Sequence, residues 1–215
     1  MDPSLSQAEA LCAVMAGIHR RGWCDGTGGN FSCVQQKEPL ELLMAPSGVD
    51  KGSVQPKDLI VVDAAGQVIQ GTGKASAETL LHLAIIATTG AGAVLHTHSP
   101  SATLLSRLAC PQGQGSAGIT IAGLEMLKGL EGITTHEAAI TVPVLANDQD
   151  LAKLSQAAVP HLPQAPHGLL IAGHGLYAWG AHLAMAKRHL EILEFLLEQT
   201  WRERLLEAPN QRIAP

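Results

Sequence analysis

Residues 92–99 of this chain read GAVLHTHS, and positions 93–98 have the composition of a buried strand that ends on two histidines. Apolar residues at helical spacing precede this strand over 76–89, with Ser76 as a candidate N-cap, and a second helical pattern follows over about 100–108. A strand between two helices is typical of an α/β protein.

The chain before this stretch is expected to contain one helix and a group of strands. Apolar residues at helical spacing run over 5–20 and stop at Gly22, as a helix end should. Short apolar runs at 31–34, 40–44 and 59–63 are separated by Gly, Pro and Asp, which predicts a meander of strands.

The second half of the chain alternates between strands and helices. Strands are expected at 118–121 and 139–145, with a hairpin-like pair at 168–172 and 175–179, whereas residues 109–118 are expected to form a mobile loop. The predicted helices of this half span 124–130, 150–159 and 181–206.

The order of these elements predicts the architecture. Strands that first meander and then alternate with helices indicate a mixed, largely antiparallel sheet with helices on both faces, not a parallel doubly wound sheet. The sequence shows no linker, low-complexity segment or internal repeat, so residues 1–215 are expected to form a single domain.

The composition limits the possible partners. Hydrophobic residues make up 46% of the chain and charged residues 15%, so part of the surface is expected to be buried in an oligomer. The net charge of −5 includes no basic tract, which argues against nucleic acid and against an anionic membrane. No apolar stretch is long enough for a transmembrane helix.

The cysteines and the N-terminal residues indicate the compartment. The four cysteines form no C-x-x-C pair, and the first twenty residues lack the basic start and apolar run of a secretory signal. We therefore expect reduced thiols and a cytoplasmic protein.

Three histidines form the strongest candidate metal site. His96 and His98 are two positions apart on a predicted strand, so both imidazoles leave the same face and can share one ion. His174 lies between two glycines at the end of another predicted strand and is the best third ligand. Three ligands with an open position are typical of catalytic zinc, although Mn, Fe or Co also accept nitrogen ligands. A hydrogen-bonded pair without metal is the alternative, and the other seven histidines are not expected to bind this ion.

Two glycine-rich turns could bind an anion. Residues 26–30 read GTGGN and residues 46–48 read PSG, and both can direct backbone N–H groups and hydroxyls at phosphate oxygens. Ser76, at the start of a predicted helix, could add its hydroxyl to the same anion. The first turn lacks the third glycine and the preceding strand of a dinucleotide-binding motif, so NAD binding is set aside. Ordinary turns remain the alternative.

Two glutamates are candidates for proton transfer. Glu78 follows Ser76 in the first turn of the helix that leads to the His-x-His strand, and Glu125 lies in the segment LEMLKG. A solvated helix face is the ordinary role of a lone glutamate.

Taken together, these motifs resemble the class II aldolase and adducin family over about residues 5–200: GTGGN, APSG, the S-x-E turn, GAVLHTHS and GHG occur in the order and spacing of that family. The resemblance implies a three-layer αβα sandwich and one Zn²⁺ per subunit on His96, His98 and His174. It also implies a phosphorylated ketose as substrate and a homotetramer with active sites near subunit boundaries.

The LEMLKG segment is similar to that of family members that remove water from a ketose phosphate. This likeness implies Glu125 as the acid/base, while Glu78 falls where ordinary family aldolases keep their catalytic glutamate, so both stay open. The alternatives are a family aldolase or epimerase and an adducin-like interaction module, which needs no metal ligands. The residues expected to contact the substrate and its phosphate are Thr27, Gly28, Gly29, Asn30, Ser47, Gly48, Ser76 and Lys128.

Overall fold

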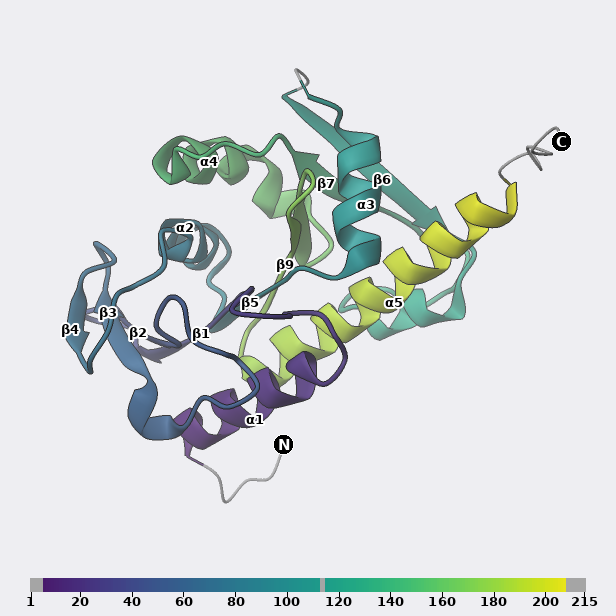
Figure 1. Ribbon diagram of the computed structural model, residues 1–215. Helices are drawn as coiled ribbons and strands as arrows, with labels where there is room; N and C mark the ends of the chain where they lie inside the picture. The colour runs from purple at the N-terminus through teal and green to yellow at the C-terminus, as the bar shows by residue number, and fades with distance from the viewer. Residues whose placement is uncertain (1–5, 113–114, 208–215) are drawn as a thin grey trace, which may run out of the picture.

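The computed structural model describes residues 6–112 and 115–207, and a mixed sheet lies at its centre (Figure 1). All neighbouring strands are antiparallel except β7 and β8, which confirms the predicted mixed, largely antiparallel sheet. Across the sheet, the strands of this part of the chain are β4 (Val68–Gln70), β3 (Ile60–Asp63), β2 (Glu41–Met44), β1 (Asn30–Gln36), β5 (Ala93–Thr97), β9 (Gly175–Gly180), β8 (Gly168–Ile171), β7 (Ala139–Leu145) and β6 (Ser116–Ala122).

Helices cover both faces of this sheet. One face packs against α1 (Gln7–His19), α3 (Pro100–Ala109) and α5 (Leu183–Glu207), and the other packs against α2 (Thr79–Thr89) and α4 (Leu151–Ala158). Figure 1 shows α1 and the long α5 on one side of the sheet, with their axes roughly aligned, and α2 and α4 on the other side. The expected α/β sandwich of three layers is therefore present.

Alternation along the central strands explains why both faces are covered. In β5, Leu95 joins the core under α1, α3 and α5, whereas Val94 joins the core under α2 and α4. The neighbouring β9 alternates in the same way, with Leu176 on the first face and Tyr177 on the second. Since both faces are apolar, neither can be left to solvent.

Most of the predicted elements occur, and the exceptions have identifiable causes. The helix expected from Ser76 begins at Thr79 with Glu78 at the N-cap position, and the Ser76 hydroxyl accepts hydrogen bonds from Asn30 Nδ2 and from the backbone N–H of Glu78. The predicted cap at Ser76 is therefore wrong. Strand β4 has no counterpart among the predicted strands, since its three residues are too few to show a period.

Short helices and the predicted loop account for the other differences. The described residues include the short 3₁₀ helices η1 (Pro56–Asp58), η2 (Glu125–Gly129) and η3 (Val159–Gln164). The bounds predicted for the loop at 109–118 are wrong at both ends, because Ala109 is the last residue of α3 and β6 already begins at Ser116. Positions 113–114 of this predicted loop lie outside the described residues. None of the helices described has both the length and the apolar character needed to cross a bilayer.

Candidate metal centre

Three histidines and one glutamate converge at one end of the central strands. His96 Nε2 lies 2.8 Å from His98 Nε2 and 3.4 Å from His174 Nε2. Glu78 Oε1 lies 3.0 Å from His174 Nε2 and 3.7 Å from His96 Nε2. One donor atom from each of the four residues falls within 4.8 Å of the others. The structure therefore brings together all three histidines of the predicted set and adds Glu78 to them.

The β5–β9 pairing places His174 beside the His-x-His segment. His174 occupies the turn between β8 and β9, which Gly173 opens with a φ of +66°. A Cβ at Gly175 would lie 1.9 Å from the carbonyl oxygen of Thr97, so only glycine lets the two backbones approach so closely. The two glycines of the GHG segment therefore have separate roles, one in the turn and one in the contact with β5.

His96 is oriented by groups outside the cluster. Its Nδ1 lies 3.0 Å from the backbone carbonyl of Leu176, and because a carbonyl can only accept, Nδ1 carries the proton and Nε2 presents its lone pair to the cluster. The ring stacks on Tyr177 with 3.9 Å between centroids and 10° between planes. Burial lowers the pKa of His96 well below its ordinary value, and burial also lowers the pKa of His98. Both imidazoles are thus held in the neutral form that binds metal.

This donor set fits one divalent metal ion. Nitrogen atoms separated by 2.8 and 3.4 Å are compatible with metal–nitrogen bonds of roughly 2.0–2.1 Å. Glu78 Oε1 lies 3.0 Å from His174 Nε2, and a carboxylate oxygen is an ordinary zinc ligand beside imidazole nitrogens. His96, His98, His174 and Glu78 would hold the ion.

The predicted anion-binding turns lie against this cluster. A Cβ at Gly28 would lie 2.8 Å from His98 Nδ1, and Gly29, with a φ of +77°, approaches the carbonyl oxygen of His96. Asn30 Nδ2 donates to Ser76 Oγ at 3.1 Å and also to Glu78 Oε2. The first turn therefore contacts both the histidines and the S-x-E segment.

The second turn is connected to the same place. The backbone N–H of Ser47 donates to the carbonyl of Lys74 at 2.8 Å, two residues before Ser76. Gly48 has a φ of +77° and open space around its Cβ position. Three of the four segments in which substrate contacts were predicted are thus connected to one another, and the fourth, which contains Lys128, is described below.

Lys51 is a buried cation that sequence reasoning missed. Its side chain is 1% exposed, and Nζ donates to the carbonyls of Thr27 at 3.0 Å and Val49 at 2.9 Å. Burial lowers the pKa of Lys51. The ammonium group therefore joins the two glycine-rich turns and places a positive charge between them. In the sequence, the feature that could have drawn attention to Lys51 is its position three residues after Gly48.

Glu125 and Lys128 lie apart from the cluster within one chain. The side chain of Glu125 is 72% exposed and pairs with Lys128 at 2.7 Å and with His136 at 3.7 Å. The hydrogen bond from Lys128 lowers the pKa of Glu125, which keeps this carboxylate ionised. Neither residue belongs to the set of donor atoms around His96.

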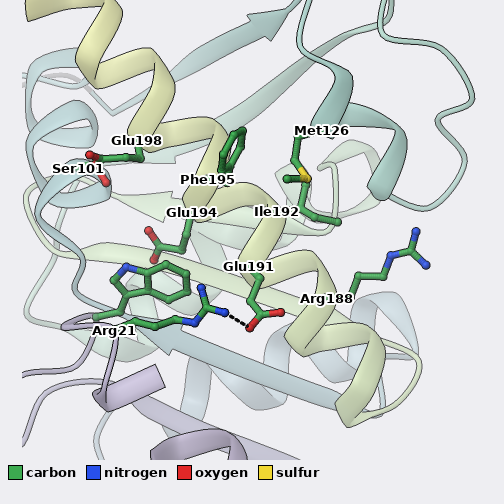
Figure 2. A pocket seen from close by; sticks show the side chains of 10 residues that line it. Arg21, Ser101, Met126, Arg188, Glu191, Ile192, Glu194, Phe195 and Glu198 are labelled. Carbon is green, nitrogen blue, oxygen red and sulfur yellow. Dashed lines mark hydrogen bonds and ion pairs between the residues drawn. The ribbon is translucent and has the colours of Figure 1, made fainter. Parts of the chain in front are cut away.

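A cavity of about 440 Å³ borders the turn that carries Glu125 (Figure 2). Met126 and Phe195 line it and are 40% and 41% exposed, and Arg21 forms an ion pair with Glu191 at 2.9 Å across it. The residue after Glu125 therefore belongs to an exposed surface that includes the apolar side chain of Phe195.

Glu194, which also lines this cavity, fixes the histidine-bearing segment and was likewise missed by sequence reasoning. Its carboxylate accepts hydrogen bonds of 2.5 Å from the hydroxyls of Thr97 and Ser99, the residues on either side of His98. Burial raises the pKa of Glu194 to about 7, although the two hydroxyls oppose this shift. Helix α5 is thereby joined to the end of β5.

The chain belongs to the class II aldolase and adducin family, because the family model for the Class II Aldolase and Adducin N-terminal domain matches residues 9–201. It is 42% identical over 205 residues to the methylthioribulose-1-phosphate dehydratase of Serratia proteamaculans (strain 568), a match that covers 94% of this chain and 97% of that protein. The methylthioribulose-1-phosphate dehydratase of Picosynechococcus sp. is 43% identical over 198 residues, or 90% of each chain. Among solved structures, L-fuculose-1-phosphate aldolase from Thermus thermophilus is similar with a TM-score of 0.73 and 25% identity, covering 94% of this chain and 96% of that one.

Proposed function

We propose that this protein is a zinc-dependent dehydratase that converts 5-methylthioribulose 1-phosphate to 2,3-diketo-5-methylthiopentyl 1-phosphate and water, a cytoplasmic step of methionine salvage. The observation that carries the proposal is the convergence of three imidazole nitrogens and one carboxylate, with the first glycine-rich turn hydrogen-bonded to Ser76 and the second hydrogen-bonded to Lys74. Relatives that match almost the whole chain and are named as dehydratases of this substrate support it.

The donor set supports zinc as the resident ion. Neutral imidazoles and a carboxylate are common ligands of catalytic zinc, and the same set also accepts Mn, Fe or Co. When bound, a divalent ion supplies Lewis-acid stabilisation of the negative charge that develops on the substrate oxygens.

The turns around the cluster would bind the substrate phosphate. Backbone N–H groups of Gly28 and Gly48 and the hydroxyls of Thr27, Ser47 and Ser76 are suitable donors, with Gly29 and Asn30 shaping the first turn. Lys51 places its buried charge between the two glycine-rich turns, so the phosphate would bind in a positive local field.

Glu125 would move the proton. It takes the proton from C3, the C4 hydroxyl leaves as water with a proton returned by the same carboxyl, and the enol becomes the 2,3-diketone. Lys128, 2.7 Å away, holds the carboxylate and adds a positive charge near the substrate. Glu78 stays with the histidines, because Asn30 donates to its Oε2 and its Oε1 lies within the cluster of metal-binding donor atoms.

Glu125 would act on the metal centre of a neighbouring copy. It is exposed and lies outside the cluster of its own chain, and its neighbour in sequence, Met126, lines a cavity together with Phe195, both of them exposed apolar side chains. A homotetramer with active sites at subunit boundaries would bury these side chains and deliver Glu125 to a partner's histidines. The carboxylate would then be desolvated only in the assembly.

Glu78 favours a second candidate function. A carboxylate within the metal cluster suits an aldolase or epimerase acting on fuculose or ribulose phosphate, and the Thermus structure is named as such an aldolase. An adducin-like interaction module has no use for the converged ligands.

Incubation of the purified protein with each substrate distinguishes these functions by product. The dehydratase yields the diketone and water from 5-methylthioribulose 1-phosphate and leaves L-fuculose 1-phosphate unchanged. Formation of dihydroxyacetone phosphate or glycolaldehyde phosphate would show an aldolase, and an isomeric pentulose phosphate would show an epimerase. Absence of any turnover would favour the interaction module.

A further inference from the structure

Glu131, His167 and His189 form a second cluster away from the metal centre. One donor atom from each lies within 4.8 Å of the others. His167 directly precedes β8 and His174 follows that strand, so the four residues of β8 separate the two clusters by roughly 13 Å along the strand. The second cluster therefore lies at the opposite end of β8 and shares no residue with the first.

His189 has the orientation of a metal ligand. It is fully buried on α5, and its Nδ1 lies 2.7 Å from the carbonyl oxygen of Trp179, which can only accept. Nδ1 therefore carries the proton, and Nε2 is left as an acceptor with no hydrogen-bond partner among the described residues. A carbonyl behind one nitrogen and a free lone pair on the other is the usual arrangement of a metal-binding histidine.

His167 is held at this position by an unusual backbone. Its φ of +58° is the one positive value at a non-glycine residue in the described part of the chain. Its N–H donates to the carbonyl of Ala165 at 2.8 Å and its carbonyl accepts from the N–H of Trp179 in β9 at 3.1 Å, so a local turn and the contact with β9 hold this conformation. Conformations of this kind occur often at binding sites, where a side chain must be placed at a fixed point.

The ring of His167 has room to turn toward an ion. It stacks on His189 with 4.1 Å between centroids and 20° between planes, so the two lone pairs do not yet converge. His167 is half-buried, and together with the exposed Glu131 it lines a cavity of about 380 Å³. Rotation of one ring, with His189 fixed, would bring the donors together.

We propose that Glu131, His167 and His189 bind a second divalent transition-metal ion, of the class of Zn²⁺. Two imidazoles and one carboxylate are a known zinc ligand set, and they leave a position open to the cavity. Bound there, the ion joins the residues after η2 to α5 and to the start of β8, and so restrains the turn that carries Glu125. The binding of this ion does not depend on the proposed dehydration, because the two clusters share no residue.

The test is equilibrium dialysis of the purified protein against Zn²⁺, with the zinc and protein contents measured afterwards. His167→Asn removes the imidazole but suits the left-handed backbone, since asparagine tolerates a positive φ better than most residues. The wild type is expected to bind a second ion that His167→Asn and Glu131→Gln lose, each keeping the first. His174→Ala should keep the second ion and lose the first.

The matched control is His161→Asn, a histidine of η3 outside both clusters, which is expected to bind both ions. Far-ultraviolet circular dichroism establishes that each variant is folded. Wild-type protein that binds no second ion, His167→Asn that keeps it, or a loss of equal size in His161→Asn would each overturn the proposal.

Discussion

Lys51 illustrates how one buried charge can organise a binding site. Its ammonium group is withdrawn from water and donates to two carbonyls, one in the first glycine-rich turn and one directly after the second. Replacement by methionine keeps most of the apolar stem while removing the charge, so folding should survive although the two turns lose their common donor. We expect Lys51→Met to raise the KM for the phosphorylated substrate by at least about 10-fold with a smaller effect on kcat.

Steady-state kinetics check this expectation, with Lys57→Met as the control because Lys57 is an exposed lysine of η1. Inorganic phosphate should also inhibit Lys51→Met less than the wild type. An unchanged KM and unchanged inhibition by phosphate would show that Lys51 has only a structural role.

Glu125 is the residue on which the reaction type depends. Glutamine has nearly the same shape but cannot take a proton, so Glu125→Gln should lower kcat by about 10²- to 10⁴-fold. Metal content should stay at the wild-type level, because Glu125 lies outside the cluster of its own chain. Glu137→Gln, another exposed glutamate in the same region, is the control. Near-normal dehydration by metal-loaded Glu125→Gln would exclude Glu125 as the base.

The residues that sequence could predict are those whose spacing has a geometric meaning. His96 and His98 are two apart on a strand, and His174 lies between glycines, so their convergence could be expected. The burial of Lys51 and Glu194 could not be predicted, because charged side chains are almost never fully buried, and the position of Lys51 three residues after Gly48 does not by itself show that the side chain is buried. For Glu125, a single chain shows only an exposed side chain, and its proposed partner is another copy.

At the scale of elements, the buried carboxylate of Glu194 couples α5 to the end of β5. Its pKa of about 7 exceeds its ordinary value of 4.5, so the folded state binds this proton more tightly than the unfolded state. The resulting stabilisation is complete below about pH 4.5 and is lost as the pH rises towards 7 and above.

Glu194→Gln should therefore weaken this pH dependence. Glutamine can still accept from one hydroxyl and donate to the other, and it carries no charge that must be buried. The unfolding free energy of the variant minus that of the wild type should rise by on the order of 2 kcal/mol as the pH increases from about 5 to about 8. Urea unfolding across this range measures it, with the exposed Glu203→Gln of α5 as control. Parallel pH profiles for Glu194→Gln and the wild type would contradict this account.

The elements themselves were largely predictable, because long apolar periods specify them. Strands such as β7 and helices such as α3 match their predicted ranges closely. The start of α2 was not predictable to the residue, since Ser76 is engaged by Asn30, which is distant in sequence. Local propensity cannot include such a contact.

At the scale of the whole molecule, the proposal requires each complete active site to combine the histidines of one chain with Glu125 of another. If Glu125 serves a neighbouring copy, a mixture of Glu125→Gln and His174→Ala chains contains sites that combine intact histidines with an intact glutamate. Random mixing of equal amounts should restore roughly a quarter of wild-type activity, although each variant alone is inactive. Recovery is measured after co-expression with two affinity tags, so that only mixed oligomers are assayed. Mixed oligomers without activity would place each complete site within one chain.

Turnover of 5-methylthioribulose 1-phosphate before and after chelation tests the central claim most directly, because it examines the metal and the reaction together. Activity should disappear when a chelator strips the ion from the cluster of His96, His98, His174 and Glu78. Zinc added in stoichiometric amount should restore the formation of the diketone. Full activity in protein shown to be free of metal would contradict the account, and so would a product other than the diketone after zinc is restored.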